Sequence, residues 1–387
     1  MNNKTLNVLF VMDALSQRNG VGSYYHDLVA QLSERVDRVE LVAPSLQSPH
    51  PCQGIALPMP GDDTQQLYLP RLRQLTHVIR EQRPDVMVVP GPGVFSIVAQ
   101  WIARREGIPV CVIHQTDYDR LAGLYYGGWR GRFFAVLMRA LTRMMFRQAS
   151  AVATISEMLR DQMRRLGAAG ARVLATPLAR QFVQPPRPAR FDHLERLLFV
   201  GRLAPEKNLP AVLDLARARP DIEVAIAGDG PLRACVEEAA RELPNLRFHG
   251  WCDRDRVRDL MDDSQLLLLP SRVEAFGTVA LEAMARGRLV LTAPGCGINA
   301  WPGMTSAIWP QREGESLAAC LARLEQLPPA QRLLRANRGR QLAMAVNEQA
   351  MQQWLQLLQY AASRRSTLPT PMSAVYALLR RMADQRA

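Results

Sequence analysis

Long hydrophobic runs are absent from this sequence of 387 residues. The first apolar run, residues 6–12, is interrupted by Asp13 and is too short for a signal peptide or a membrane span, and no later run approaches the length of a transmembrane helix. The six cysteines are scattered without a Cys-x-x-Cys pair, which argues against a disulfide framework or a zinc site. We therefore expect a cytoplasmic protein with reduced thiols.

Lysine is also nearly absent, since only Lys4 and Lys207 occur and arginine fills almost every other cationic position. The net charge is +12, and residues 1–190 hold 23 basic and 14 acidic residues. From residue 120 to residue 156 there is no acidic residue at all. Such a basic first half fits an anionic partner, which can be a membrane surface, a nucleic acid or a phosphorylated substrate.

The chain is too long for one ordinary core and fits two domains. In the first half, short apolar runs alternate with helical patterns, which predicts a doubly wound α/β domain. The expected strands cover residues 6–12, 39–42, 86–90, 110–114, 151–154 and 172–175, and the expected helices cover 22–35, 66–83, 95–105, 131–147 and 156–165.

The second half shows the same alternation, and the proline-rich residues 185–188 mark an extended connector between the two halves. A long helix over 345–362 is expected to return to the first domain. The predicted division is a first domain over 1–184, a linker over 185–192, a second domain over 193–345 and C-terminal helices over 346–387.

The stretch 271–287 is the strongest candidate for a binding site. It follows an apolar strand at 266–269, and its helix is expected to begin near Gly277, so that the N–H groups of Thr278 and Val279 lie where open α/β sheets bind anions. Glu274 precedes this helix and Glu282 lies a little over one turn inside it. Carboxylates beside an anion site suit a nucleotide sugar. The alternative is a surface helix with a solvated Glu282.

Two further loops of the second half fit a phosphate ligand. Arg202 and Lys207 share one strand-to-helix loop, where together they can neutralise a diphosphate. Gly228 and Gly230 form the turn after the next strand, where glycine permits close approach of a ligand. This turn can also be purely structural, with Asp229 as a helix cap.

In the first half, Gly20 and Gly22 follow the first strand and allow the backbone to approach a ligand. His114 ends the fourth strand, where it can donate to a sugar hydroxyl or a developing charge, or can cap the strand through local hydrogen bonds. Asp117 and Asp119 spell an Asp-x-Asp sequence, which we regard as chance because no other metal-ligand cluster accompanies it.

Residues 131–147, preceded by Trp129, predict a basic amphipathic helix. Arginines on one arc and apolar residues on the other fit a membrane interface, although a core helix with a solvated arginine face gives the same pattern. The expected membrane contacts are Trp129, Arg132, Phe133, Arg139, Arg143 and Arg147.

These motifs together resemble those of the retaining glycosyltransferases of family 4, which have the two-domain GT-B fold. Glu274 to Glu282, with Phe276 and Gly277 between them, resembles the Glu-x7-Glu signature, and Arg202 with Lys207 resembles the Gly-Arg-x4-Lys motif. The segment around His114 is similar to one in members that act on lipid acceptors. Asn299 to Trp301 depart from the family pattern, which usually has an acidic residue there.

The resemblance implies that Arg202, Lys207 and the N–H groups of Thr278 and Val279 stabilise the departing diphosphate. Glu282 would accept from the ribose and Glu274 from the donor sugar, with His114 as a further catalytic residue. The donor-binding set implied by the motifs is Gly20, Gly22, Gly228, Gly230, Phe276, Gly277, Thr278, Val279 and Glu282.

We therefore expect transfer of a sugar from a UDP- or GDP-sugar to a lipid or membrane-linked glycan, with retention of configuration and with no cofactor or metal. The protein is expected to lie on the inner face of the cytoplasmic membrane. The alternative is a non-catalytic sugar-nucleotide or lipid-binding protein on the same fold. We expect no nucleic-acid partner, because no recognition module accompanies the basic charge.

Overall fold

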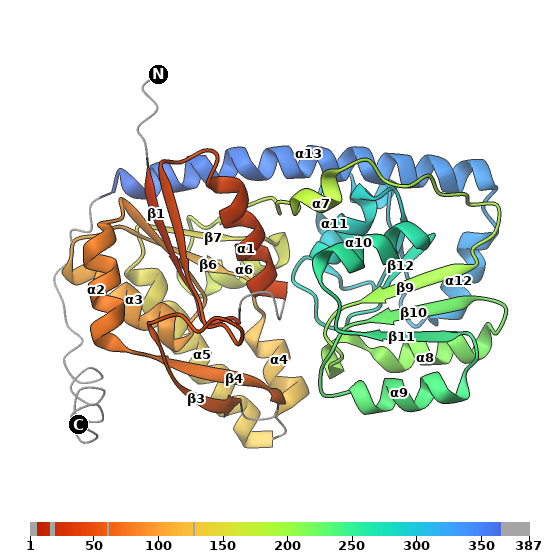
Figure 1. The fold of residues 1–387 in the computed structure, drawn as a ribbon, viewed down its shortest axis with the longest axis horizontal. Helices are drawn as coiled ribbons and strands as arrows, with labels where there is room; N and C mark the ends of the chain where they lie inside the picture. The colour runs from red at the N-terminus through yellow and green to blue at the C-terminus, as the bar shows by residue number, and fades with distance from the viewer. Residues whose placement is uncertain (1–5, 16–19, 60–61, 127, 365–387) are drawn as a thin grey trace.

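The computed structural model describes residues 6–15, 20–59, 62–126 and 128–364 of the chain. It contains two six-stranded parallel sheets, one from each half, with helices packed around them (Figure 1). Helix α13 runs along both units at the top of the view (Figure 1). This is the two-domain, doubly wound α/β architecture that the alternation of strands and helices predicts.

The first sheet has the strand order β2-β1-β5-β6-β7-β8. Its strands are β1 (Asn7–Val11), β2 (Arg38–Val42), β5 (Val86–Pro90), β6 (Val110–His114), β7 (Ala151–Thr154) and β8 (Arg172–Val173). The helices of this half are α1 (Gly20–Leu32), α2 (Leu72–Gln82), α3 (Val94–Arg105), α4 (Tyr118–Tyr125), α5 (Gly128–Arg147), α6 (Glu157–Arg165) and α7 (Arg180–Val183). Parallel strands are covered on both faces and read as apolar runs, so the sequence predicts β5, β6 and β7 with their observed bounds.

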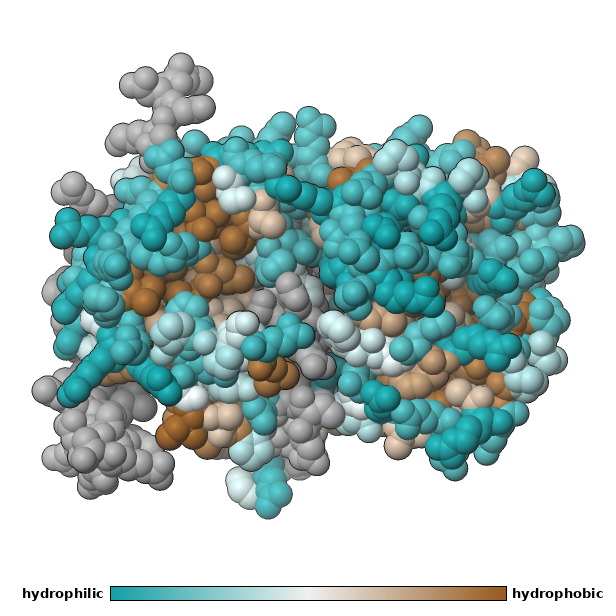
Figure 2. Space-filling view, in the orientation of Figure 1, coloured by the Kyte–Doolittle hydropathy of each residue, from teal (hydrophilic) through white to brown (hydrophobic). Residues whose placement is uncertain are grey.

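An antiparallel hairpin, β3 (Gln53–Met59) and β4 (Asp62–Pro70), lies outside both parallel sheets. The predicted start of a helix at residue 66 is wrong, because residues 66–70 pair with β3 and α2 begins at Leu72. Tyr68 is buried while its neighbours Leu67 and Leu69 are exposed, an alternation of period two that fits a strand. Hydrophobic side chains are visible over this hairpin (Figure 2).

The second sheet has the strand order β11-β10-β9-β12-β13-β14. Its strands are β9 (Arg196–Val200), β10 (Glu223–Ala227), β11 (Leu246–Gly250), β12 (Leu266–Leu269), β13 (Leu289–Thr292) and β14 (Trp309–Pro310). Its helices are α8 (Leu209–Ala218), α9 (Arg233–Glu242), α10 (Arg254–Asp263), α11 (Thr278–Ala285) and α12 (Leu317–Glu325), with short 3-10 turns η1 (Pro205–Lys207), η2 (Gly297–Ala300) and η3 (Met304–Ser306).

Helix α13 (Pro329–Ala362) packs against both domains. The helix predicted over 345–362 begins earlier than expected, and the predicted division at 345–346 falls inside one continuous helix. Its buried side chains recur at spacings of three and four, as at Ala343, Val346, Ala350 and Trp354. A single apolar stripe therefore serves both halves of the molecule.

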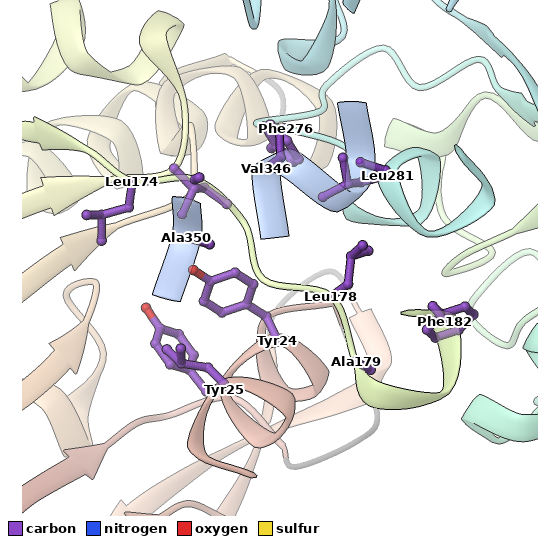
Figure 3. Close-up of a cluster of buried hydrophobic side chains, with 14 of the residues drawn as sticks. Tyr24, Tyr25, Leu174, Leu178, Ala179, Phe182, Phe276, Leu281, Val346 and Ala350 are labelled. Atoms are coloured by element: carbon purple, nitrogen blue, oxygen red, sulfur yellow. The ribbon is translucent and has the colours of Figure 1, made fainter. Parts of the chain in front are cut away.

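Side chains from both domains form one continuous apolar cluster (Figure 3). Tyr24 of the first domain, Phe276 of the second, and Val346 and Ala350 of α13 belong to it. The Trp354 indole donates to the Tyr24 hydroxyl over 3.2 Å. The cluster therefore connects the cores of the two halves through buried apolar contacts.

The connector between the domains is attached to the second one. Residues 185–190 form neither helix nor strand. The buried guanidinium of Arg286 donates to the Gln184 carbonyl over 2.7 Å, and that of Arg288 donates to the Arg187 carbonyl over 2.7 Å. Asp262 pairs with both arginines. A buried polar network of the second domain therefore holds the main chain of the connector.

Candidate active site

The strands of the second sheet end toward the first domain (Figure 1). Backbone hydrogen bonds join the loops that follow these strands into one layer. Leu203 N donates to the Asp229 carbonyl over 2.9 Å, which joins the loops after β9 and β10. A Cβ at Gly228 would lie 1.9 Å from the Gly201 oxygen, and one at Gly230 would lie 2.6 Å from the Leu203 oxygen. Both predicted glycines thus permit contact between two loops, whatever they do for a ligand.

Lys207 and Glu274 are brought together from loops 67 residues apart. The Lys207 Nζ lies 2.6 Å from Glu274 Oε2, and the Ser271 hydroxyl donates to the same oxygen over 3.3 Å. Burial alone would lower the pKa of Lys207, but the Glu274 carboxylate outweighs it and the pKa lies above its ordinary value. A charged ammonium is therefore present in this layer at neutral pH.

The anion-binding helix start predicted near Gly277 is the N-terminus of α11. Gly277 has φ 101°, which favours glycine, and a Cβ there would lie 2.9 Å from Leu269 Cδ2. The first helical bonds are donated by Ala280 and Leu281, so the N–H groups of Thr278 and Val279 precede the helical ladder.

The loop after β13 covers the segment that precedes α11. Ile298 N donates to the Phe276 carbonyl over 2.7 Å, and the Phe276 ring packs edge-on against Trp301. Phe276 is 1% exposed, so its side chain belongs to the packing beneath the site. The side chain of Phe276 therefore does not line the site. The predicted contact of Phe276 with a donor would involve its main chain.

Glu282 is buried and not the solvated surface residue of the alternative interpretation. Its Oε1 lies 2.8 Å from a nitrogen of Arg254, whose other nitrogen pairs with Asp27 of the first domain. The Arg254 guanidinium also lies over the ring of Phe182. Burial raises the pKa of Glu282 above its ordinary value, and Arg254 opposes that rise. Neither Arg254 nor Asp27 was expected from the sequence.

Arg202 faces the first domain across the gap between the sheets. Its NH1 donates to the Tyr125 hydroxyl over 3.0 Å and lies 3.4 Å from Glu206 Oε1, while the Tyr125 hydroxyl donates to Glu206 Oε2 over 2.7 Å. The three side chains thus form a closed triangle that joins α4 to η1. Tyr125 lies 77 residues before Arg202 and was not predicted as its partner.

His114 lies at the end of β6 and is 2% exposed. Its ring contacts the rings of Tyr118 and Phe146, and the side chain of Gln162 on α6 approaches it as a hydrogen-bonding neighbour. The alternative of local strand capping is therefore not observed. Burial lowers the pKa of His114 to about 4, against the pull of Asp117, so the imidazole is neutral at neutral pH.

The glycine-rich loop after β1 is described only from Gly20, where α1 begins; Asn19 lies outside the described residues. Gly20 is exposed and has open space around it, and Gly22 is buried.

A residue that the sequence did not single out, Asp13, holds the start of α3. It accepts from Phe95 N over 2.6 Å and from the Ser96 hydroxyl over 2.7 Å. A Cβ at Gly93 would lie 2.0 Å from Asp13 Cγ. An internal carboxylate therefore occupies this helix terminus.

Helix α5 is buried only in part. The core takes Met145 and Phe146, whereas large apolar side chains at Trp129, Phe133, Val136 and Leu137 are exposed. The predicted contact arginines Arg132, Arg139, Arg143 and Arg147 are exposed as well. The interpretation as a core helix therefore fits its last turn but not its first half. None of the helices in the described ranges is both long and apolar enough to cross a membrane.

Within the described ranges, no group of three or more His, Cys, Asp or Glu is placed to hold a metal ion. A surface groove of about 600 Å³ lies between α2 and α3 and includes Trp101 and Arg105 in its lining. None of the predicted site residues lines it, so we locate the candidate site by its charged groups and loops instead.

Each half of the chain matches a model of a known protein family. Residues 183–340 match the family described as glycosyl transferases group 1, and residues 19–179 match the glycosyl transferase 4-like domain. A glycogen synthase of Mycobacterium tuberculosis is 30% identical over 281 residues, which cover 67% of this chain and 65% of that protein.

A second relative from Mycobacterium tuberculosis is a GDP-mannose-dependent alpha-(1-6)-phosphatidylinositol dimannoside mannosyltransferase. It is 30% identical over 224 residues, covering 54% of this chain and 57% of that protein. The chain thus spans less than two thirds of the length of either relative. Sucrose-phosphate synthase of Thermosynechococcus elongatus has a similar fold, with a TM-score of 0.71 at 16% identity over 91% of this chain and 98% of that one.

Proposed function

Because the chain belongs to the glycosyl transferases of group 1, we propose that it moves a sugar from a nucleotide-diphosphate donor to an acceptor, with retention of configuration. The observation that carries this proposal is the gathering of Arg202, Lys207 and the start of α11 in one layer of loops. Two cations and a helix N-terminus are what a departing diphosphate requires.

The donor diphosphate binds among these groups. Lys207 is charged at neutral pH, and Arg202 supplies a planar guanidinium that suits phosphate oxygens. The N–H groups of Thr278 and Val279 add neutral donors at the positive end of α11. As the bond to the sugar breaks, negative charge grows on the diphosphate, and these fixed groups stabilise it without a metal ion or other cofactor.

The two carboxylates orient the donor. Glu274 lies beside Lys207, which supports a role for its carboxylate in accepting from the hydroxyls of the donor sugar. Glu282 is held by Arg254 and accepts from the ribose hydroxyls. Hydroxyls donate more strongly to an ionised carboxylate than to a neutral carboxyl group, so the cations beside Glu274 and Glu282 support donor recognition.

His114 contributes as a neutral hydrogen-bonding group. Its pKa near 4 leaves one ring N–H to donate at neutral pH, beside the Gln162 side chain. It donates to a hydroxyl of the transferred sugar or to charge that develops on it. We propose no covalent enzyme nucleophile, because the donor phosphate itself helps to take the acceptor proton, as in the family that the motifs resemble.

The acceptor is a lipid or a membrane-linked glycan. The exposed apolar residues of α5, together with its exposed arginines, support peripheral binding to anionic lipid on the inner face of a cytoplasmic membrane. The name of one relative includes a phosphatidylinositol acceptor, which fits this class. Nucleic acid is not proposed as a partner.

The test is turnover of UDP-, GDP- and ADP-sugars by the purified chain, with EDTA present and with anionic vesicles present or absent. Release of the nucleoside diphosphate from one donor, by transfer or slow hydrolysis, is the expected result. Tight nucleotide-sugar binding with no release under any condition would favour the alternative, a non-catalytic binding protein on this fold.

A further inference from the structure

One polar triangle crosses from the first domain to the phosphate loop of the second. Its members are Tyr125 at the end of α4, and Arg202 and Glu206 in the loop between β9 and α8. The side chains of Arg202 and Glu206 are largely shielded from water, at 19% and 10% exposed. Electrostatic interactions between such groups are stronger than on an open surface.

Glu206 is a fixed part of this loop. Its carbonyl accepts from Arg272 N over 2.8 Å, which ties η1 to the loop after β12. Its carboxylate lies next in sequence to Lys207 and 3.4 Å from Arg202. An anion in this position competes with a diphosphate for the same guanidinium, so an unshielded Glu206 would oppose donor binding.

The Tyr125 hydroxyl reduces this competition. It donates to Glu206 Oε2 and accepts from Arg202, so that only the other oxygen, Oε1, faces the guanidinium directly. Burial and the Glu206 carboxylate raise the pKa of Tyr125 far above its ordinary value, which keeps the phenol protonated and able to donate. Arg202 already lies 3.4 Å from Glu206 Oε1, and without the hydroxyl Oε2 would also be open to pair with Arg202.

We propose that Tyr125 is a positioning residue that holds Arg202 available for the donor diphosphate. It acts through Glu206 and does not itself touch the donor. Since Tyr125 comes from the first domain, the contact also makes phosphate binding in the second domain depend on how the two domains are placed. The inference rests on the proposed function, because Arg202 must bind a diphosphate for its position to matter.

Helix α4, which carries Tyr125, is tied to the exposed helix α5. Arg139 of α5 lies 3.4 Å from Asp119 of α4. A Cβ at Gly131 of α5 would lie 2.4 Å from the Tyr126 carbonyl, so the two backbones touch where α4 ends. The tyrosine is therefore held by a packed helix pair and not by a free loop.

The test measures dissociation constants for UDP, GDP and ADP by calorimetry on the full chain and then follows the tightest of them. Tyr125→Phe should weaken its binding about tenfold, the size of one hydrogen bond to a charged group. The matched control is Tyr68→Phe, which removes a hydroxyl bonded to Gln66 over 2.7 Å in the β3–β4 hairpin. This control should leave nucleotide binding unchanged.

A double-mutant cycle with Glu206→Gln separates positioning from simple packing. Glu206→Gln alone should bind the nucleotide as tightly as the wild type or more tightly, and Tyr125→Phe should have no further effect in that background. Additive losses, an unchanged Tyr125→Phe variant, or equal weakening in Tyr68→Phe would overturn the inference. If Tyr125→Phe does not fold, the Glu206→Gln variant still decides the matter. Weaker nucleotide binding by Glu206→Gln than by the wild type would by itself overturn the inference. A wild-type chain that binds none of the three nucleotides would instead refute the proposed function itself.

Discussion

At the scale of single residues, charge pairing determines what each candidate group can do. Lys207 is the one lysine of the described residues, and its contact with Glu274 outweighs burial and holds the pKa of Lys207 above its ordinary value. The same pair leaves Glu274 without a cation if the lysine is lost, so a substitution at 207 affects stability as well as binding. Activity and folding must therefore be measured together.

Lys207→Ala should lower kcat/KM by about 100-fold or more, because one fixed donor to the developing charge is removed. The measurement is donor turnover beside thermal unfolding of the same sample. Arg217→Ala is the matched control, since Arg217 is an exposed cation on α8 that pairs only with Asp214 of its own helix in the described structure. Full activity in Lys207→Ala would remove Lys207 from the phosphate site.

His114 makes stability depend on pH in a known direction. Its folded pKa of about 4 lies below the ordinary 6.5, so the unfolded chain binds more protons between these values and stability falls as pH falls through this window. The loss reaches about 3 kcal/mol below pH 4. His114→Gln should be less sensitive across the window in urea unfolding. Equal slopes for both proteins would contradict the buried neutral imidazole.

At the scale of elements, a buried ion-pair network and an exposed helix face lead to separate predictions. The buried network of Asp262, Arg286 and Arg288 holds the connector to the second domain, directly after α11. The exposed first half of α5 extends from the other domain with apolar and basic side chains together. Disruption of the network is predicted to lower stability, and the exposed half of α5 is predicted to be a binding surface.

Asp262→Ala should lower the free energy of unfolding by about 3 to 5 kcal/mol, because two buried guanidinium groups lose their anion. Asp259→Ala is the control on the same helix, since its pairs with Arg187 and Arg258 are more exposed and should contribute less than about 1 kcal/mol. Urea unfolding measures both. A similar loss in the two variants would show that burial of the network does not matter.

The face of α5 predicts reversible binding to anionic vesicles that weakens with salt. Basic residues at such a surface contribute about 1 kcal/mol each, so changing Arg132, Arg139, Arg143 and Arg147 to Gln should abolish flotation with the vesicles. The control is the double variant Leu333→Ser and Leu334→Ser, because these two exposed apolar residues lie on α13 and not on α5. This variant should still float with the vesicles. A wild-type chain that fails to float at low salt would exclude the membrane proposal.

At the scale of the whole molecule, contacts between the domains decide what the sequence can predict. The buried strands were predictable because their apolar runs are local signals, and the helix start at Gly277 likewise follows from neighbouring residues. The β3–β4 hairpin was missed because its pairing overrides a pattern also compatible with a helix. The chain beyond residue 315 was expected to be helical, but the start of the long helix was placed at residue 345 and not at Pro329.

The residues of the candidate site likewise fall into those that local motifs predict and those that only the fold brings together. Arg202, Lys207, Glu274 and Glu282 belong to local motifs and were identified from the sequence. Their partners Tyr125 and Arg254 were not, because those contacts depend on how distant segments are placed in the fold. Asp27 and Arg254 are 227 residues apart, and no spacing along the chain connects them.

The most direct test of the account is a thermal-shift titration of the full chain with UDP, GDP and ADP in the presence of EDTA. The account predicts that one nucleotide raises the unfolding midpoint, since a ligand at 100 times its dissociation constant adds about 2.7 kcal/mol of stability. It also predicts that Lys207→Ala loses most of this shift. No shift with any nucleotide, or a shift abolished by EDTA, would contradict a metal-free diphosphate site built from Arg202, Lys207 and the start of α11.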